Sequence, residues 1–174
     1  MDLIAERKAI EAALDAYRAE LDRLPDDLFD VTPPSGGWSF AEVYSHILQS
    51  TLGASIATEK CARGTAPTTR KGLNLLGRFL MLTNHFPPAK IKAPPVIPVL
   101  KISKEEARNM IIKCRKRIES IAPLLPDAED HHRISHPRLG MLHAKHWFKF
   151  LRVHLQHHLK QLKRIEREMG TRIV

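Results

Sequence analysis

The chain has 174 residues, 43% of them apolar and 27% charged, which suits one domain over residues 1–174 and excludes a disordered or fibrous protein. No apolar run approaches the roughly 20 residues that cross a bilayer, and the N-terminal residues are too charged for a secretory signal. Two cysteines are too few for a disulfide framework. We therefore expect a cytoplasmic protein without a membrane partner. The net charge of +9 forms no dense basic run and aromatic residues are only 6%, so nucleic acid is not the expected partner.

Two amphipathic helices are predicted in the first third of the chain. Apolar residues recur at helical spacing over 2–24, and a proline ends this helix. A loop is expected over 26–37, where prolines and glycines are frequent. A second helix is predicted from Ser39 to about Gly64, because Ser39 and Glu42 have the spacing of a capping box.

The segment 65–103 has the least regular pattern. Leu73–Leu82 can form a short helix, and prolines then punctuate an extended connection over 84–101. Long connections without regular structure are uncommon in compact domains and often serve as crossovers or as covers of a site. We therefore expect at least one crossover between helices.

Two further amphipathic helices are predicted toward the C-terminus. One begins after Ser103 and ends near Pro123, and the other begins around 142–144 and ends near Met169. A polar loop is expected between them, and no segment has a convincing strand pattern. Four long amphipathic helices joined in this way predict an all-α fold, a four-helix bundle with a long Pro-rich crossover connection.

The last helix places two histidines on its apolar side. With a turn of about 100° per residue, His158 falls in the middle of the apolar stripe and His154 at its edge, whereas His157 lies on the polar side. Imidazoles four residues apart on one helix can chelate one metal ion. His46, beside Ile47 on the second helix, can supply a third ligand if the two helices are neighbours. The alternative interpretation is that these histidines only form hydrogen bonds in the core.

Two stretches of the sequence resemble the DinB/YfiT-like superfamily. Gly37-Trp38-Ser39, followed by Glu42 and His46, resembles the opening of that family's second helix. A later stretch is similar to the fourth-helix signature of one DinB-like subfamily, in which HP-x-x-G-x-L precedes a Trp and then H-x-x-H-H-x-x-Q. The matching residues here run from His136 to Leu142, then Trp147, then His154 to Gln161.

The resemblance implies a four-helix bundle that forms a homodimer and binds a metal. Carried over position by position, the implied ligands are one histidine of the second helix and two of the last helix: His46, His154 and His158. Relatives include transferases and isomerases that use a low-molecular-weight thiol. The implied partners are therefore such a thiol and a small-molecule substrate.

Three neutral imidazoles bind zinc, nickel, iron and similar divalent ions, among which we expect zinc or nickel. Three protein ligands leave a coordination position open, where the ion lowers the pKa of a bound water or thiol. The expected function is a metal-dependent enzyme, either a thiol-dependent S-transferase or a hydrolase. The alternatives are a non-catalytic metal-binding or stress-response bundle and a helical interaction protein that binds no metal.

Other reactive side chains are expected to have structural roles. Cys114 lies on the apolar stripe of its helix and is interpreted as a core residue, whereas Cys61 can be exposed but has no base beside it. Trp38 is expected to pack at the end of the bundle and Trp147 on its core seam. Glu42 is interpreted as a cap rather than as a partner of a metal-bound histidine.

The remaining histidines are less informative. His131, His132 and His136 lie in the polar loop, where a second metal site is an alternative that the sequence does not favour. Similar sequences often carry Ser or Thr at the position of His143 and an acidic residue at that of His146. The helical projection places His146 on the solvent side and leaves the role of His143 open.

Overall fold

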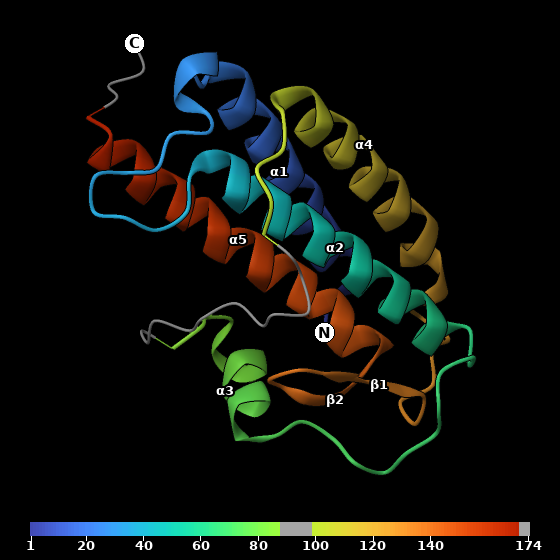
Figure 1. The fold of residues 1–174 in the computed structure, drawn as a ribbon. Helices are drawn as coiled ribbons and strands as arrows, with labels where there is room; N and C mark the ends of the chain where they lie inside the picture. The colour runs from blue at the N-terminus through green and yellow to red at the C-terminus, as the bar shows by residue number, and fades with distance from the viewer. Residues whose placement is uncertain (88–98, 171–174) are drawn as a thin grey trace.

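Four long helices dominate the computed structural model, which describes residues 1–87 and 99–170 (Figure 1). They are α1 (Leu3–Arg23), α2 (Phe40–Ala62), α4 (Lys104–Ile121) and α5 (Ala144–Glu168). Short 3-10 turns follow two of them: η1 (Asp26–Leu28) and η2 (Ala122–Leu124). α1 packs against α4 and α5, and α2 packs against the same two helices, so the four enclose one core. The expected all-α four-helix bundle is confirmed.

The direction of the helices explains the long connection in the middle of the chain. α2 and α4 run the same way in Figure 1, so the chain after α2 has to return along the bundle before α4 begins. A short helix, α3 (Leu75–Thr83), lies in this connection, close to the predicted range 73–82. Of the predicted Pro-rich connection over 84–101, the stretch 88–98 lies outside the described residues.

Capping boxes set the starts of α2 and α4. The Ser39 hydroxyl accepts a hydrogen bond from the Glu42 backbone N–H at 3.3 Å, and the Ser39 N–H donates to the Glu42 carboxylate at 2.8 Å. Ser103 and Glu106 repeat this arrangement at 3.1 and 2.7 Å. The predicted capping role of Glu42 is confirmed. Because the cap fixes where α2 begins, it also fixes His46, about two turns further along the helix.

Buried tyrosines tie three of the helices together. The Tyr17 hydroxyl of α1 donates to the Leu155 carbonyl of α5 at 2.8 Å, and the Tyr44 hydroxyl of α2 donates to the Tyr17 carbonyl at 2.7 Å. The two rings are fully buried and meet edge to face with centroids 5.6 Å apart. Each buried hydroxyl has a partner, so its desolvation is compensated and the position of α5 against α1 is fixed.

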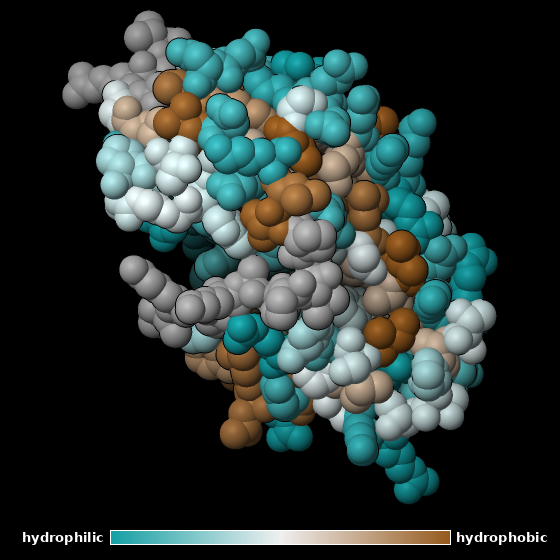
Figure 2. All heavy atoms as spheres, in the orientation of Figure 1, coloured by the Kyte–Doolittle hydropathy of each residue, from teal (hydrophilic) through white to brown (hydrophobic). Residues whose placement is uncertain are grey.

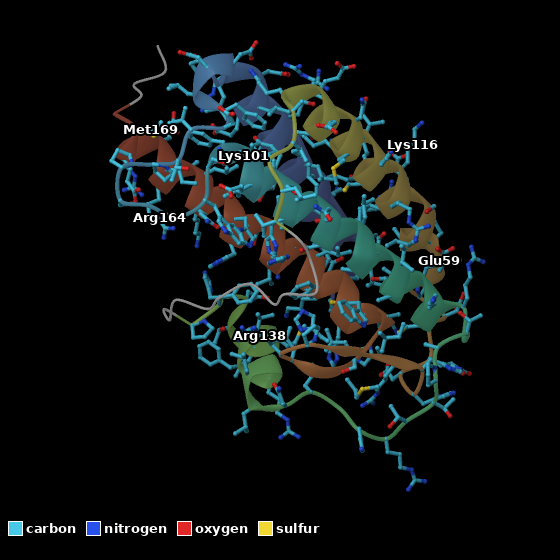
Figure 3. The ribbon with its side chains drawn as sticks, viewed as in Figure 1. Glu59, Lys101, Lys116, Arg138, Arg164 and Met169 are labelled. Atoms are coloured by element: carbon cyan, nitrogen blue, oxygen red, sulfur yellow. The ribbon has the colours of Figure 1, made fainter. Side chains whose placement is uncertain are left out.

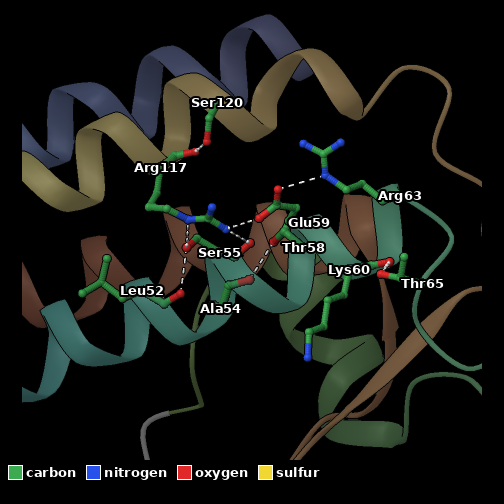
Figure 4. Close-up of polar contacts among 10 residues, drawn as sticks. All are labelled: Leu52, Ala54, Ser55, Thr58, Glu59, Lys60, Arg63, Thr65, Arg117 and Ser120. Carbon is green, nitrogen blue, oxygen red and sulfur yellow. Dashed lines mark hydrogen bonds and ion pairs between the residues drawn. The ribbon is translucent and has the colours of Figure 1, made fainter.

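A polar network joins α2 to α4 near the C-terminal end of α2 (Figure 4). Arg117 of α4 donates to the Ser55 hydroxyl at 3.1 Å and to the Glu59 carboxylate at 2.7 Å. Glu59 also accepts a hydrogen bond from Arg63 at 2.9 Å. A guanidinium that bonds two groups of one helix restrains the rotation of α4 against α2 more than a single ion pair would.

A two-stranded hairpin precedes α5, and the expectation of a loop without strands is therefore wrong. β1 (Arg133–His136) and β2 (Gly140–His143) are antiparallel, with His136 opposite Gly140. Gly140 has φ +87°, and a Cβ built on it would lie 2.7 Å from the Asn74 backbone nitrogen, so the hairpin packs closely on the residues before α3. Four-residue strands depend on such distant contacts for their stability, and a local sequence pattern does not contain them.

The surface is mostly polar, and Figure 3 shows labelled side chains such as Lys116 and Arg164 extending away from the bundle. The helix α3 is an exception, because Leu75 and Leu82 are 84% and 83% exposed. Their region appears as hydrophobic atoms over α3 in Figure 2. Within residues 1–87 and 99–170, no helix has both the length and the apolar character needed to cross a membrane.

Candidate metal centre

Three histidines from two helices meet inside the bundle, and we call them the bundle site. His46 is carried by α2, and His154 and His158 lie one turn apart on α5, the helix against which α2 packs. One imidazole nitrogen from each residue lies within 4.8 Å of one from each of the others. The structure thus brings together the three residues selected from the sequence, because their helices are neighbours.

The spacing of the nitrogens suits a single ion. Nε2 of His154 and Nε2 of His158 are 3.1 Å apart. Zinc–imidazole bonds of about 2.0–2.1 Å in a tetrahedral arrangement place two ligand nitrogens about 3.3–3.4 Å apart. The two imidazoles of α5 are therefore already close to the separation that they would have as ligands of one ion.

The protonation of His158 is set by Gln161. Nδ1 of His158 lies 2.7 Å from the Gln161 amide oxygen, and because that oxygen only accepts hydrogen bonds, Nδ1 carries the proton. The Nε2 lone pair of His158 is then left on the side of His154. At His46, Nδ1 is buried and has no hydrogen-bond partner within the described part of the chain. A buried imidazole nitrogen of this kind is costly unless an ion or another polar group satisfies it.

Aromatic rings cover the bundle site. The ring of Trp38 lies 5.0 Å from that of His46 and is nearly parallel to that of His158 at 6.5 Å. Phe150 stacks on His154 with ring centroids 4.9 Å apart. Trp38 therefore forms a wall of the site in addition to its expected packing role. Rings in these positions limit contact with water and so strengthen electrostatic interactions within the site.

Burial keeps the imidazoles of the bundle site neutral. Burial is the main cause that lowers the pKa of His46 to about 4 and the pKa of His158 to about 3, and neighbouring histidines add to the effect. The pKa of His154 is lowered well below its ordinary value, again mainly by burial and further by His158 and His46. Divalent ions bind the neutral imidazole, so at neutral pH an ion would not have to displace a proton.

A cavity of about 410 Å³ lies beside the middle of α5. Its lining includes Phe86, which follows α3, and His157 and Lys160 of α5. Phe86 contacts His157 and His154 at ring-centroid distances of 4.7 and 5.8 Å. Phe86 thus links the cavity lining to His154, although none of the three histidines of the bundle site lines the cavity itself.

Comparison with known proteins identifies the family. The DinB superfamily matches this chain over residues 9–162. The chain belongs to the DinB superfamily. The crystal structure of TT2238, a four-helix bundle protein, is similar with a TM-score of 0.61 at 17% sequence identity, and the match covers 93% of this chain and 98% of that one. That similarity concerns the fold alone. No curated protein matches the sequence.

Neither cysteine of this DinB-superfamily chain is placed to act as a nucleophile. Cys114 is buried as expected, its thiol donates to the Leu48 carbonyl at 3.7 Å, and burial raises its pKa to about 12. Cys61, for which the sequence allowed exposure, is also fully buried, and burial raises its pKa to about 11. Both thiols therefore stay protonated and shielded at neutral pH.

The other histidines of α5 and its cap only partly follow the helical projection. His157 is exposed, as the projection indicates. His146 was expected on the solvent side, but its ring stacks on His143 at 3.7 Å and its Nδ1 is buried. The strand β2 causes this difference, because it ends at His143 beside the first turn of α5. His143 is the N-cap of α5, where it forms no side-chain capping bond to a described residue.

Trp147, on the same helix, is buried as expected.

Sequence reasoning missed the residues that support the ligands. Gln161 lies in the family motif, and its position three residues after His158 puts both side chains on one face of α5, a signal that could have identified it. Phe150, four residues before His154, offers the same signal. Trp38 precedes α2, so only the folded chain shows that it covers His158.

Proposed function

We propose that this chain is a metal-dependent enzyme that acts on a small molecule, with His46, His154 and His158 as the metal ligands. The observation that carries the proposal is the cluster of three imidazole nitrogens within 4.8 Å of one another inside the bundle. Their lowered pKa values keep the imidazoles in the neutral form that binds a divalent ion. Zinc and nickel are the ions we expect, since both accept imidazole nitrogen.

The donor set favours a catalytic site over a closed structural one. Structural zinc sites use four protein ligands, whereas three ligands leave a position for water or substrate. A divalent ion bound there would bring the pKa of a water in that position to about 7, and it would deprotonate a thiol that coordinates it. The surrounding residues have supporting tasks: Gln161 keeps Nε2 of His158 free of a proton, and Trp38 and Phe150 limit the entry of water.

The proposed reaction is thiol-dependent S-transfer or hydrolysis. Both need a nucleophile that forms near neutral pH, a thiolate or a hydroxide. Because Cys61 and Cys114 are buried and hold their protons, the thiol of the first reaction would come from a small molecule. The cavity of about 410 Å³, whose lining residue Phe86 contacts His154, offers space for such a molecule, since small-molecule sites typically have volumes of about 300–1,000 Å³.

Elemental analysis of the protein purified without a His-tag tests the proposal. The parent chain is expected to hold a transition metal, and His158→Ala is expected to lose one equivalent of it. His157→Ala is the matched control, because it removes an exposed histidine from the neighbouring position and should keep that equivalent. The loaded protein would then be assayed for thiol transfer and for hydrolysis.

Two other results would overturn the proposal in different ways. If incubation with zinc or nickel loads no ion that depends on His158, the imidazoles are core residues joined by hydrogen bonds. If an ion binds but the chain shows neither activity and unfolds when the ion is removed, the bundle holds a non-catalytic metal.

A further inference from the structure

A second group of ligand-type side chains lies just before β1, near the end of α2 (Figure 1). It consists of Glu129, His131 and His132, and we call it the hairpin cluster. Nε2 of His131 lies 3.1 Å from a Glu129 carboxylate oxygen, and Nε2 of His132 lies 3.6 Å from the same oxygen. Two ligand atoms on one tetrahedral zinc ion are about 3.3–3.4 Å apart, a separation that lies between these two distances.

Backbone contacts hold the hairpin cluster in place. The Thr69 N–H donates to the His131 carbonyl at 2.9 Å, and His132 pairs with Thr68 in an antiparallel bridge. The two imidazole rings stand with their centroids 4.4 Å apart. Because the backbone is already ordered by these contacts, an ion would bind without the entropic cost of ordering a loop.

The protonation of His132 also suits a ligand. Nδ1 of His132 lies 2.8 Å from the Ala66 carbonyl oxygen, which only accepts hydrogen bonds, so Nδ1 carries a proton and Nε2 is the nitrogen available to an ion. Metal-binding histidines commonly donate their other ring nitrogen to a carbonyl in this way. Gly64 leaves room beside Nε2 of His132, because a Cβ atom at position 64 would lie only 3.2 Å from that nitrogen.

We propose that the hairpin cluster binds one divalent transition-metal ion, with zinc as the best match. One carboxylate and two imidazoles are ligands that zinc accepts, and the carboxylate offsets part of the charge of the ion. This proposal does not depend on the bundle site, with which the hairpin cluster shares no residue. The competing explanation is an ion pair between Glu129 and protonated imidazoles, which accounts for the same distances and predicts no metal binding.

A zinc titration of the full chain without a tag, in competition with a chromogenic chelator, counts the sites. The unaltered chain, first made metal-free, is expected to take up two equivalents of zinc. His131→Ala and Glu129→Gln are each expected to take up one. His158→Ala, which alters only the bundle site, is also expected to take up one. His85→Ala is the matched control, because it removes another exposed histidine and should keep both equivalents.

The pattern among the variants separates the two sites. Uptake that is unchanged in both His131→Ala and Glu129→Gln would overturn the hairpin site, whatever happens at the bundle site. A single equivalent that is lost in His131→Ala but kept in His158→Ala would support the hairpin site and overturn the bundle site. Circular dichroism of each variant establishes that it is folded, and Glu129→Gln preserves the shape of the side chain that it replaces.

Discussion

The bundle site and the hairpin cluster, the two proposed metal sites, differ in the physical setting of their side chains. In the bundle site, His46 and His158 are only 4% and 6% exposed, and burial keeps their imidazoles neutral. In the hairpin cluster, the His131 side chain is 55% exposed, and a carboxylate from Glu129 stands beside it. Burial thus supplies neutral ligands in one place, and local charge supplies attraction in the other.

This difference has a consequence for stability. Neutral imidazoles held in the core are ready to bind an ion, but their burial disfavours protonation in the folded chain. Acid therefore favours the unfolded chain, in which the same imidazoles take up protons more readily. Exposed side chains are solvated in both the folded and the unfolded chain, so the hairpin cluster should cost the fold little when no ion is present. The three predictions below test that contrast.

The largest expected effect is the acid sensitivity of the metal-free protein. His46 and His158 become protonated in the unfolded chain below about pH 6.5, but in the folded chain their pKa values are about 4 and about 3. Their contribution to stability is therefore complete above pH 6.5 and is lost as the pH falls toward those values. At pH 5 the free energy of unfolding should have fallen by about 2 kcal/mol for each imidazole. Urea denaturation with a chelator present, at neutral pH and at pH 5, measures this loss.

Two variants show whether the bundle site is the source. His158→Leu removes one buried imidazole and should reduce the difference between the two pH values by about 2 kcal/mol. Val153→Ala shortens a buried side chain of the same helix that does not titrate, so it should lower the stability equally at both pH values. An undiminished pH dependence in His158→Leu would contradict the prediction.

The next effect concerns the orientation of a ligand within the bundle site. Gln161→Leu removes the amide oxygen that accepts the hydrogen bond from Nδ1 of His158. Loss of such a partner typically weakens metal binding about 10–100-fold, or about 1.4–2.8 kcal/mol, so zinc affinity at the bundle site should fall by that factor. Competition with a chelator of known affinity measures it. Gln156→Leu is the control, since Gln156 accepts a hydrogen bond from Arg152 on the same helix. Equal affinities in the two variants would show that Gln161 does not position the ligand.

The sequence predicted the bundle site because its signals are local. The spacing of His154 and His158 on one helix, and the capping box that begins α2, depend on residues within four positions of one another. His46 required one further assumption, that α2 and α5 are neighbours, and the long amphipathic helices made that plausible without deciding it. The structure supplies that contact.

A second metal site in the polar loop is only a less favoured alternative from the sequence, because the hairpin cluster depends on residues far apart in the chain. His132 is oriented by the Ala66 carbonyl, 66 positions away, and the hairpin rests on the backbone at Asn74. No local periodicity reports such contacts, so the sequence alone does not favour a metal site among the loop histidines. Glu129 also had no distinguishing signal, since a single acidic residue in a polar loop is common.

The smallest expected effect is on the stability of the metal-free hairpin cluster. His131→Ala removes a side chain that is 55% exposed, while the backbone carbonyl of residue 131 still accepts its hydrogen bond from Thr69. The free energy of unfolding at neutral pH should therefore change by less than about 0.5 kcal/mol when a chelator is present. With zinc at about 100 times its dissociation constant for this cluster, the unaltered chain should gain about 2.7 kcal/mol that His131→Ala lacks. A large loss of stability without metal would mean that His131 supports the fold itself, and the contrast with the buried imidazoles of the bundle site would then fail.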